Sequence, residues 1–541
     1  MPVGAGRIDG VDSGEAVASL PARRILCVFP RYTPAFGMFQ HAYPLTDGVR
    51  ALMPPQGLLV IAAALPASWQ VRFIDENLRP ARPADFAWAD AVFVSGMHAQ
   101  RRQIEDVRRR AQAAGKTAVL GGSSVSASPQ DYPQFDYLHV GELGDATEEL
   151  VARLARDCSR PERQVVLITR ERRQLIDFPL PAYELAELER YLTGSVQYSS
   201  GCPYQCDFCD IPALYGRTPR LKSPAQVTAE LDKMRACGLT GAVYFVDDNF
   251  IAHRKAVREL LPHLVEWQRR HGYPFVFSCE ATLNIAKRPE ILELMREALF
   301  ETVFCGIETP EPDALRAIAK EHNMMVPILD AVQTLNRYGL EVTAGIILGL
   351  DTDTPDTGPR ILSFIERSRI PMLTINLLQA LPKTPLWDRL AREGRLIEDD
   401  ARDSNVAFRL PYADVLAVWR DCMARAYAPK ALFDRYRHQA AATYPNRLTP
   451  SYGPERRSWR NIRRGLVMLT RVFWHAGLRS DYRAEFWKFA RPLLRRGELA
   501  HVIRVGLMAH HMIVSAREAC AGRQTASHYS TRIGDAPLAV R

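Results

Sequence analysis

Three cysteines lie close together in the middle of the chain, at Cys202, Cys206 and Cys209. Thiolates on one tight loop can ligate three irons of a [4Fe–4S] cluster and leave the fourth iron open to a small molecule. Zinc is the alternative, but three closely spaced cysteines with no fourth Cys or His nearby do not complete a closed tetrahedral site. The spacing therefore predicts that these three residues hold a cluster with a reactive, open iron.

Four short motifs with polar residues or glycines come later in the chain, each directly after an apolar stretch. Their candidate site residues are Asp247, Asp248, Asn249, Glu280, Glu308, Gly345 and Gly349. Taken singly, each motif also has a structural explanation: helix capping for the acidic run, a surface position for Glu308 and packing for the glycines. Function in barrels of parallel strands lies at the carboxyl ends of the strands, so the shared position favours a site.

The strands that would position these motifs recur between residues 191 and 390. The predicted strands cover residues 195–199, 242–246, 275–279, 302–306, 342–348 and 373–379. Helical patterns separate them. Six βα units of this kind predict a partial (β/α)6 barrel over residues 191–390.

Residues 23–155 also alternate apolar runs of strand length with helical patterns. The predicted strands cover residues 24–30, 70–75, 91–95 and 116–121. Buried parallel strands have this length and β-branched content, which predicts a doubly wound, Rossmann-like α/β domain. Such sheets bind ligands at the carboxyl ends of their strands. Small residues that let a bulky ligand approach the backbone lie there: Ser95, Gly96, Gly121, Gly122 and Ser123.

The spacing Cys-x3-Cys-x2-Cys, with the aromatic Phe208 just before the last cysteine, resembles the cluster loop of the radical S-adenosylmethionine (SAM) enzymes. The resemblance implies that the amino and carboxylate groups of SAM chelate the free iron. It also implies that one electron from the cluster splits SAM into methionine and a 5′-deoxyadenosyl radical. The three cysteines are then both metal ligands and catalytic residues, and Phe208 lies at the cofactor site.

The later motifs follow in the order of this family, and the resemblance implies that they bind SAM. The run Asp247-Asp248-Asn249 resembles the site for the SAM amino group, where carbonyl oxygens and a carboxylate would receive an ammonium. Glu280 and Glu308 close the next two strands, where a carboxylate can accept both ribose hydroxyls. The run Gly345 to Gly349 fits the Gly-x-Ile-x-Gly adenine strand, although Thr352 stands where a glutamate is usual.

The α/β domain directly upstream of the cysteine loop resembles the cobalamin-binding domain of the cobalamin-dependent radical SAM enzymes. We therefore expect the small residues at its strand ends to bind cobalamin as methylcobalamin. Many cobalamin domains supply a cobalt-ligating histidine from an Asp-x-His-x-x-Gly loop, and Asp136 to Gly141 has these residue types at the wrong spacing. His139 is expected to pack or hydrogen-bond near a strand end. The first places to look for the lower face of cobalamin are the Pro30 to Phe39 loop and Met97.

A radical initiator and a methyl-carrying cobalamin in one chain resemble the class B radical SAM methyltransferases. Over most of its length the chain is most similar to the hopanoid C-2 methylases, in domain order, in the runs Gly201 to Pro212 and Val246 to Phe250, and in its basic helical C-terminus. The resemblance implies methylation of an unactivated carbon, C-2 of a hopanoid lipid. It implies a [4Fe–4S] cluster, SAM and cobalamin as cofactors and a reduced flavodoxin or ferredoxin-type electron donor.

Other function classes share some of these features. A cobalamin-dependent radical SAM enzyme that methylates or rearranges another secondary metabolite would carry every motif described above. A methylthiotransferase would need a second cysteine triad in the first domain, and only Cys27 and Cys158 precede the loop. A non-catalytic binding protein is disfavoured, because substitution of the three loop cysteines should then leave its function intact.

Composition predicts a cytoplasmic protein. Ten cysteines in 541 residues, most of them single and scattered through apolar segments, do not form a disulfide framework. Residues 1–22 have no basic start followed by an apolar core, so they are predicted to be a disordered tail rather than a signal peptide. No run of about 18 uncharged apolar residues occurs. Any contact with the inner membrane is therefore expected to be peripheral.

Residues 391–520 are predicted to form a basic helical domain. Residues 451–520 hold 14 Lys and Arg against 5 Asp and Glu, a surplus of nine that equals the formal charge of +9 of the whole chain. Three explanations stay open: helices packed on the barrel with solvated arginines, a surface for an anionic membrane and, least favoured, a nucleic-acid patch. Residues 156–190 are predicted to be a linker and residues 521–541 a disordered tail.

Overall fold

The first sheet of the molecule has six parallel strands in the order β2-β1-β3-β4-β5-β6. The computed structural model describes residues 21–454 and 456–530. The strands of this sheet are β1 (Arg24–Phe29), β2 (Gln70–Asp75), β3 (Ala91–Ser95), β4 (Thr117–Gly121), β5 (Tyr137–Val140) and β6 (Val165–Ile168). The strand order reverses between β1 and β3, and ligands of doubly wound sheets bind outside the carboxyl ends of the strands near such a point.

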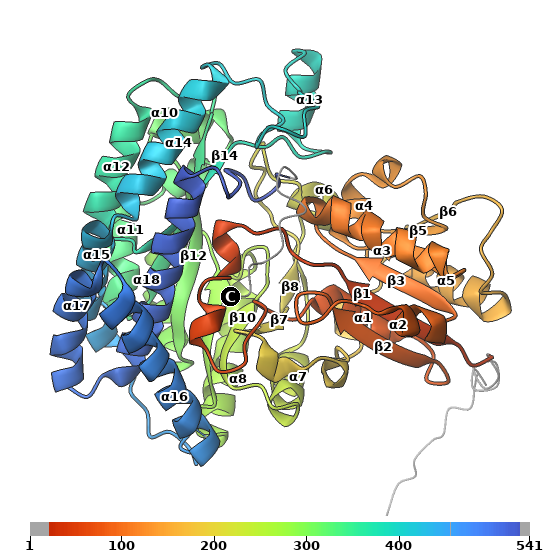
Figure 1. Cartoon of the computed structure of the whole chain (residues 1–541), viewed down its shortest axis with the longest axis horizontal. Coiled ribbons are helices and arrows are strands. Elements are labelled where there is room, and N and C mark those ends of the chain that lie inside the picture. Colours follow the sequence, from red (N-terminus) through yellow and green to blue (C-terminus); the bar gives the residue numbers. More distant parts are fainter. Residues whose placement is uncertain (1–20, 455, 531–541) are drawn as a thin grey trace, which may run out of the picture.

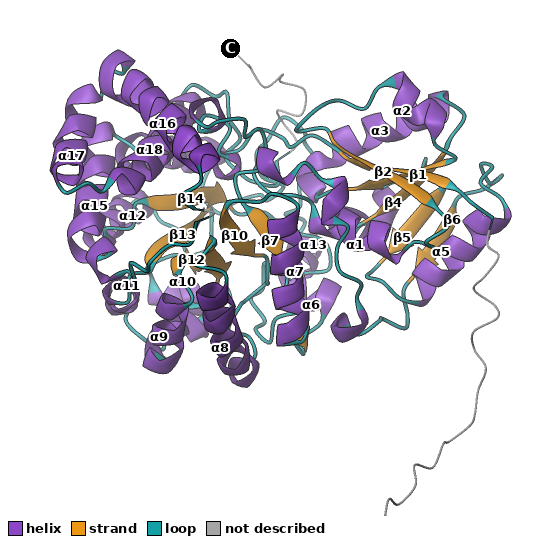
Figure 2. Ribbon diagram, turned by 90° about the horizontal axis from the view of Figure 1, so that it is seen from below, coloured by secondary structure: helices purple, strands orange, loops and turns teal. Residues whose placement is uncertain are grey.

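Helices cover both faces of this sheet (Figure 2). They are α1 (Gln56–Ala64), α2 (Pro83–Trp88), α3 (Arg101–Ala113), α4 (Ser123–Ala127) and α5 (Asp145–Arg156). Residues of α2, α3 and α4 share one buried core with the sheet, and residues of α1 and α5 share the core on the other face. The near-continuous apolar run Ile25 to Phe29 is buried on both sides, as parallel strands between two helical layers require. The predicted doubly wound fold is confirmed.

The sixth strand lies inside the segment 156–190, which the sequence predicts to be a linker. β6 pairs in parallel with β5, with Tyr137 opposite Val165 and Val140 opposite Ile168. Four apolar residues between charged runs gave too short a pattern to be recognised as a strand. The sheet therefore extends beyond residue 155, and the connecting segment is shorter than predicted.

The second sheet also has six parallel strands, in the order β14-β13-β12-β11-β10-β7, with no hydrogen bonding between β7 and β14 among the described residues. Its strands are β7 (Gly194–Val196), β10 (Gly241–Phe245), β11 (Phe275–Glu280), β12 (Phe300–Glu308), β13 (Glu341–Leu348) and β14 (Met372–Leu377). All six strands predicted for the partial barrel are present. A short antiparallel pair, β8 (Ser199–Ser200) and β9 (Arg220–Leu221), flanks the cysteine loop.

Helices alternate with these strands, and most of them lie along the outside of the barrel (Figure 2). They are α6 (Ile211–Tyr215), α7 (Pro224–Ala236), α8 (Arg254–Arg270), α9 (Pro289–Glu297), α10 (Pro312–Ala317), α11 (Ile328–Arg337), α12 (Thr357–Ser368) and α13 (Pro385–Arg392). α7 begins where Ser223 Oγ accepts a hydrogen bond from the backbone N–H of Gln226 (3.2 Å), with Pro224 in the first turn. α8 begins in the same way at His253, whose Nδ1 accepts from Ala256 N–H (3.2 Å).

The C-terminal helices close the open side of the barrel (Figure 1). They are α14 (Tyr412–Ala426), α15 (Pro429–Ala442), α16 (Trp459–Val472), α17 (Arg483–Arg495) and α18 (Leu499–Cys520), with a π-helical stretch at Phe473–Arg479. Their buried residues belong to one core with the barrel strands. Trp419 Nε1 donates to the carbonyl oxygen of Ile375 in β14 (2.8 Å). Packing on the barrel therefore accounts for the buried faces of these helices.

Among the described residues, α18 is the one helix long and apolar enough to cross a membrane by length and composition. It carries Arg504, Arg517 and Glu518, and 56 % of its most apolar window is buried inside the protein. It packs against α14, α16 and α17. The helix therefore has the contacts of a central core helix of the C-terminal domain.

The two predicted disordered tails differ in outcome. Residues 1–20 and 531–541 lie outside the described residues. Residues 521–530 are described, and Gln524 to Ser527 are buried. The prediction of a disordered tail from residue 521 is therefore wrong for these ten residues. Their polar composition gave no indication that they pack into the barrel.

The segment between β1 and α1 leaves the first domain and lies against α18 (Figure 1). His511 Nε2 of α18 is 2.8 Å from the carbonyl oxygen of Phe36, and His41 Nε2 is 2.8 Å from Glu518 Oε2. The first domain and the C-terminal domain therefore both contribute to the wall of the barrel.

Candidate active site

The cysteine loop begins at a glycine whose conformation other residues rarely adopt. Gly201 has φ +97°, and a Cβ at this position would lie 2.8 Å from the carbonyl oxygen of Gly216. Gly201 N–H donates to Asp248 Oδ2 (2.8 Å), and Cys202 N–H donates to the Gly216 carbonyl (3.2 Å). These contacts fix the direction in which the loop leaves β8.

The far end of the loop is bound to two neighbouring elements. Asp207 N–H donates to the carbonyl oxygen of Ile318 after α10 (3.1 Å), and Leu386 N–H at the start of α13 donates to the carbonyl oxygen of Asp207 (2.9 Å). A backbone fixed at both ends limits the positions that the three thiols can take.

The three cysteines fit the predicted iron–sulfur cluster. Cys202, Cys206 and Cys209 are free thiols of intermediate burial. In the part of the chain that the structure describes, no three His, Cys, Asp or Glu side chains converge closely enough to hold a single metal ion. Three thiols on one loop suit a cluster with one open iron, and their role as its ligands stays a prediction.

A buried lysine lies beside the cysteines. Lys320 Nζ is 2.5 Å from Glu308 Oε1 and 5.5 Å from the ring centre of Phe208. Burial raises the pKa of Cys206 to about 11, and the positive charge of Lys320 offsets part of that rise. Lys320 was not predicted from the sequence, because a single lysine after a short helix has no characteristic spacing.

Two more side chains that the sequence did not indicate contact the loop. The ring of Tyr204 stacks on His322 at 3.8 Å between ring centres. Asn284 Nδ2 donates to the hydroxyl of Tyr204 (2.6 Å). Asn284 follows β11 at the carboxyl end of that strand, and this position is the signal that could have identified it. His322 lies in the short helix Glu321–Met324 after α10, where no sequence pattern indicates it.

Glu308 closes β12 in a strained backbone conformation. Its φ is +63°, in the left-handed region that residues other than glycine seldom adopt. A Cβ on Gly306 would lie 2.4 Å from Glu308 Oε1, so glycine there leaves room for the carboxylate. A Cβ on Gly345 would lie 3.5 Å from Glu308 Oε2. The structure thus brings together Glu308 and Gly345, which were both predicted to bind SAM.

The carboxylates of the acidic run after β10 accept hydrogen bonds mainly from backbone N–H groups. Asp247 accepts hydrogen bonds from the N–H groups of Tyr198 (3.1 Å) and Ser199, and Asp248 accepts from Gly201. Burial raises the pKa of Asp247 to about 7, and the hydrogen bond from the Ser199 hydroxyl opposes that rise. Because its oxygens are already engaged, Asp247 has the contacts of a positioning residue.

The third residue of this run lies beside the first cysteine. Asn249 Oδ1 accepts from Thr282 N–H (3.4 Å). Burial raises the pKa of Cys202, and a hydrogen bond from the side chain of Asn249 opposes that rise. Since His253 caps α8, the alternative explanation of the acidic run as a helix cap does not apply.

Glu280 closes β11 and faces the interior of the barrel. Its Oε1 accepts a hydrogen bond from the hydroxyl of Tyr244 (3.2 Å). Burial raises the pKa of Glu280 to about 7, and this hydrogen bond offsets part of the rise. The carboxyl group can therefore change its protonation state near neutral pH.

Gly349 ends β13 in the left-handed region, with φ +91°. A Cβ there would lie 2.6 Å from a ring carbon of Phe408, and its N–H donates to Asp353 Oδ2 (2.7 Å). Thr352, which stands where the family has a glutamate, is exposed. Gly349 therefore has a structural role, and its contact with adenine stays a prediction.

A cavity of about 330 Å³ lies between the first sheet and the barrel. Four of the five residues predicted to bind cobalamin line this cavity: Ser95, Gly121, Gly122 and Ser123. On the barrel side it is lined by Ser200, Tyr215 and Asp248. Gly122 has φ +96°, and a Cβ there would lie 2.3 Å from Ser95 Oγ. The cavity has room for only part of a ligand as large as cobalamin. The fit of cobalamin therefore depends on Gly121 and Gly122, which leave the backbone open on the side of the cavity that faces the barrel.

Gly96, the fifth predicted residue, does not line this cavity. A Cβ at Gly96 would lie 3.0 Å from Ile104 Cδ1, so the glycine lets α3 pack against β3. His139 is buried and its Nε2 is 2.9 Å from Thr147 Oγ1, in agreement with the packing role expected of it. Ala35 to Phe39 of the Pro30 to Phe39 loop line the barrel cavity, and the residue that faces the lower side of cobalamin stays open.

Polar contacts join the two domains around the 330 Å³ cavity. Glu142 after β5 accepts hydrogen bonds from Arg220 Nη2 (2.5 Å) and Ser200 Oγ (3.2 Å) of the barrel. Lys383 Nζ donates to the carbonyl oxygen of Ser126 in α4 (2.6 Å). These contacts hold the face that is predicted to bind cobalamin against the barrel.

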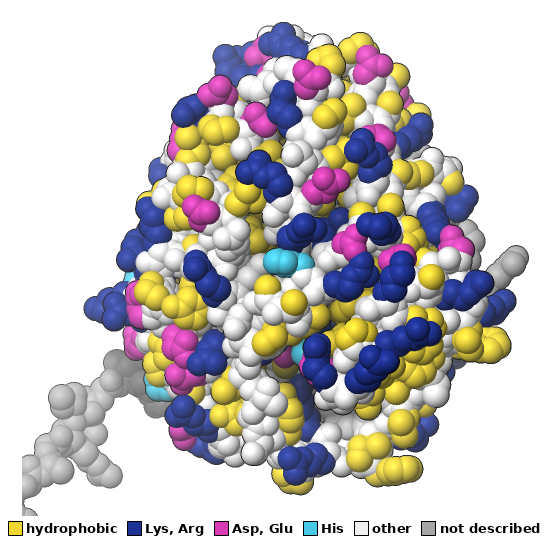
Figure 3. All heavy atoms as spheres, turned by 90° about the vertical axis from the view of Figure 1, so that its left-hand side faces the viewer, with side chains coloured by type: hydrophobic (Ala, Val, Ile, Leu, Met, Phe, Trp, Pro, Cys, Tyr) yellow, Lys and Arg dark blue, Asp and Glu magenta, His cyan; other side chains and the backbone are white. Residues whose placement is uncertain are grey.

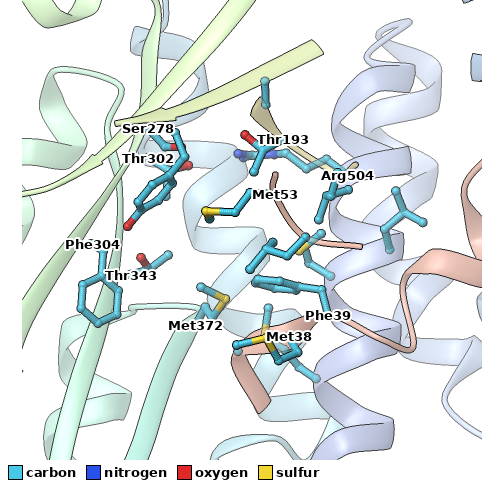
Figure 4. A pocket seen from close by; sticks show the side chains of 18 of the residues that line it. Met38, Phe39, Met53, Thr193, Ser278, Thr302, Phe304, Thr343, Met372 and Arg504 are labelled. Atoms are coloured by element: carbon cyan, nitrogen blue, oxygen red, sulfur yellow. The ribbon is translucent and has the colours of Figure 1, made fainter. Parts of the chain in front are cut away.

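A larger cavity of about 1080 Å³ fills the barrel (Figure 4). Side chains labelled there come from the segment between β1 and α1 and from the strands: Met38, Phe39, Met53, Thr302, Phe304, Thr343 and Met372. The cavity runs from Glu280 at the carboxyl ends of the strands to Glu341 and Arg504 at their amino ends. Strands of six residues span about 20 Å. The cavity is therefore long, mostly apolar and closed by α16 and α18.

Three family models match the chain in the order of these domains. The B12 binding domain matches residues 44–151, the Radical SAM superfamily residues 196–365 and a Domain of unknown function (DUF4070) residues 384–525. The predicted cobalamin, SAM and iron–sulfur cofactors are those of the two named families.

Curated relatives cover the chain at two levels of similarity. The Hopanoid C-2 methylase of Rhodopseudomonas palustris (strain TIE-1) is 63% identical over 97% of this chain and 99% of the relative. The Bacteriochlorophyllide d C-12(1)-methyltransferase of Chlorobaculum tepidum is 25% identical over 65% of this chain and 77% of the relative.

Two solved structures share the fold. The radical SAM methyltransferase TsrM from Kitasatospora setae, with cobalamin and [4Fe–4S] cluster bound, aligns with a TM-score of 0.55 and 16% identity, covering 70% of this chain and 80% of TsrM. The cobalamin-dependent radical enzyme OxsB, with aqua-cobalamin and SAM bound, aligns with a TM-score of 0.57 and 14% identity, covering 95% of this chain and 83% of OxsB. Together with the family matches, they confirm the predicted arrangement of an α/β domain, a partial barrel and a helical region.

Proposed function

We propose that this chain, which belongs to the family of the hopanoid C-2 methylases, methylates C-2 in ring A of a hopanoid. It is a cobalamin-dependent radical SAM methyltransferase. The observation that carries the substrate proposal is the barrel cavity. Its volume of about 1080 Å³ and its apolar lining suit a rigid polycyclic lipid.

The shape of the cavity favours one orientation of the substrate. Ring A must reach the carboxyl ends of the strands, where Glu280 and the cysteine loop lie. The remaining rings then extend along the strands past Met372 and Phe39 towards Arg504. Arg504 Nη2 is 3.1 Å from Glu341 Oε2, and this ion pair would meet any polar group at the far end of the lipid.

The residues that would hold the cofactors surround this end of the cavity. Cys202, Cys206 and Cys209 would ligate the cluster, and the small residues after β3 and β4 would face cobalamin. When bound, the cluster with SAM supplies hydrogen abstraction from carbon, and cobalamin supplies the methyl group. The chain itself binds SAM through Glu280, Glu308 and the neighbouring glycines, fixes the lipid and excludes water.

We further propose that the C-terminal domain contacts an anionic membrane surface. Apolar side chains along α16 and the π-helical stretch after it are strongly exposed: Trp459 (74%), Ile462 (46%), Leu466 (52%), Trp474 (53%) and Leu478 (60%). Apolar and basic side chains lie side by side on this end of the molecule (Figure 3). Amphipathic helices with aromatic and basic residues bind the headgroup region of anionic bilayers.

The same helix also borders the barrel cavity. Asn461, Arg464 and Met468 of α16 line the cavity, whereas Ile462 and Leu466 face outwards. Only α16 itself would therefore separate a lipid in the bilayer from the barrel cavity. This arrangement supports collection of a water-insoluble substrate from the membrane.

Vesicle binding tests the membrane proposal. We expect the protein to co-sediment with phosphatidylglycerol vesicles more than with phosphatidylcholine vesicles, and binding to fall as salt is raised. Trp459→Ser should weaken binding, because it removes the most exposed apolar side chain of α16. Ile176→Ser, at a site 58% exposed outside the C-terminal domain, is the matched control. Equal binding of both variants and of both vesicle types would contradict the proposal.

The electron for SAM cleavage must come from a reductant, which we propose to be a reduced flavodoxin or ferredoxin-type protein. The formal charge of +9 favours approach of an acidic partner of this kind. Turnover with such a protein should slow as ionic strength rises, whereas turnover with a small chemical reductant should not. A salt-independent rate with the protein donor would contradict this assignment.

Product analysis tests the substrate proposal. The protein is reconstituted anaerobically with iron, sulfide and methylcobalamin and incubated with SAM, reductant and a hopene. We expect a methylated hopanoid together with 5′-deoxyadenosine and S-adenosylhomocysteine. Formation of 5′-deoxyadenosine without methylated lipid, from a protein shown to hold its cluster and cobalamin, would retain the radical chemistry and reject the hopanoid as substrate.

A further inference from the structure

The chain folds back into the barrel after its last helix. Residues 521–530 run beside the end of β14 (Figure 1), where Leu377 N–H donates to the carbonyl oxygen of Ala526 (2.7 Å). Gln524, Ala526 and Ser527 are at most 2% exposed. The tail is therefore built into the wall of the barrel at the carboxyl ends of its strands.

Side-chain hydrogen bonds hold the tail on both sides of this contact. Gln524 Nε2 donates to Glu518 Oε2 (2.9 Å), the same carboxylate that pairs with His41. Ser530 Oγ donates to Asp403 Oδ1 (2.8 Å). The tail thus joins α18, the segment between β1 and α1, and the loop before α14.

Two aromatic residues of the tail face the reaction end of the barrel cavity. His528 and Tyr529 line this cavity together with Glu280. Burial raises the pKa of Tyr529 above its ordinary range, and the negative charges of Asp210 and Cys209 add to the rise. Tyr529 is therefore close both to the cysteine loop and to the space that the proposed substrate would fill.

We propose that Gln524–Ser530 is a plug that closes the barrel cavity at its reaction end, and that Tyr529 is a substrate-positioning residue in this plug. The role of positioning the hopanoid rests on the proposed function, whereas closure of the cavity does not. The ring of Tyr529 covers the substrate space beside the cluster loop, so it holds the reacting carbon near SAM and keeps solvent away. His528, 5.5 Å from Tyr529 between ring centres, supports the same wall.

Loss of the plug should have a measurable effect on the radical reaction. A substrate held in the wrong place, or water admitted to the site, leaves SAM cleavage without a methylated product. Misplacement by about 1 Å can cost a hundredfold in rate. Loss of the plug should therefore appear as uncoupling, with more 5′-deoxyadenosine formed for each methylated lipid.

The test compares Tyr529→Ala, Tyr529→Phe and the control Arg523→Ala in the reconstituted full-length enzyme. Arg523 is exposed, is in the same tail and does not line the cavity. We expect Tyr529→Ala to raise the ratio of 5′-deoxyadenosine to methylated hopanoid about tenfold and to raise the KM for the lipid. Tyr529→Phe should stay within about twofold of wild type, because its ring still covers the site, and Arg523→Ala should leave the ratio unchanged.

Cleavage of SAM in the absence of lipid separates the plug from the substrate proposal. If no hopanoid is methylated, the proposed substrate fails, but Tyr529→Ala should still cleave SAM faster than wild type because solvent enters the site. Hydrogen exchange should show the amides of residues 524–530 protected in wild type and exposed in Tyr529→Ala. Unchanged exchange and unchanged coupling in this variant, or faster methylation by it, would overturn the proposal.

Discussion

The ion pair between Lys320 and Glu308 supports a prediction about the stability of the protein. Its two side chains are 8% and 10% exposed, and Nζ lies 2.5 Å from Oε1. Lys320→Met removes one partner and leaves Glu308 buried and unpaired. Breaking a buried pair in this way costs about 3–5 kcal/mol. At roughly 2–4 °C per kcal/mol for a domain of this size, Tm should fall by about 10 °C.

The effect should depend on pH in a defined direction. A buried carboxyl without a partner costs less when it carries no charge, so acid should reduce the penalty. We therefore expect the difference in Tm between Lys320→Met and wild type to be largest near pH 8 and smaller near pH 5. Calorimetry or circular dichroism of the cluster-free protein at several pH values measures it.

Two further variants decide whether the pair is the cause. The double variant Lys320→Met with Glu308→Gln should recover most of the lost stability, because no charge is left buried. Arg316→Met is the matched control: Arg316 pairs with Asp313, but their side chains are 56% and 92% exposed, so it should cost at most about 0.5 kcal/mol. Equal losses for Lys320→Met and Arg316→Met, or no recovery in the double variant, would show that the buried ion pair is not the cause of the lost stability.

Three more predictions concern the cavities and the domain interface. Gly122→Ala should lower the cobalamin retained per chain after gel filtration, because its Cβ would lie 2.3 Å from Ser95 Oγ. Gly465→Ala, with no atom within 4 Å of the added Cβ and outside the 330 Å³ cavity, is the control, and equal retention would contradict a role of Gly122 in cobalamin binding. Burial raises the pKa of Glu280 from 4.5 to about 7, so its contribution to stability is full below pH 4.5 and is lost as pH rises through 7. Glu280→Gln should therefore match wild type in Tm at pH 4 and exceed it at pH 8 in the cofactor-free protein, and a lower Tm of Glu280→Gln at pH 8 would contradict the raised pKa of Glu280. Arg220→Met breaks the contact with Glu142 and should expose the interface between the domains to limited proteolysis, so an unchanged cleavage pattern would speak against a role of this contact in docking.

Much of the fold was predictable because its signals are local. Parallel strands buried on both faces have continuous apolar runs, and those at residues 91–95 and 275–280 needed no other information. β6 was missed because its four residues lie on an edge strand, where two of them, Val166 and Ile168, are exposed and charged residues flank them. The buried tail was missed because Gln524 to Ser530 are polar, and only the surrounding barrel makes them interior.

The candidate site residues also fall into two groups: those that local spacing in the sequence indicates, and those that only tertiary contacts bring to the site. The three cysteines and the glycines at strand ends could be identified because their spacing or conformation is a property of a single loop. Lys320 and Tyr529 reach the site through the fold, from a short helix and from the end of the chain, so no spacing indicates them. For Gly96 the local signal was misleading. Its position after a strand suggested that it binds a ligand, but a Cβ there would contact Ile104 of α3.

Methylation of C-2 by a radical mechanism can be tested by following a single hydrogen atom. A hopanoid labelled with deuterium at C-2 is incubated with the reconstituted enzyme, SAM and reductant, and the 5′-deoxyadenosine is analysed by mass spectrometry. We expect deuterium in the 5′-deoxyadenosine from this substrate, none from a hopanoid labelled at C-3, and a methyl group at C-2 of the product. Methylation with no deuterium transfer from C-2, or transfer from another carbon, would contradict hydrogen abstraction at C-2.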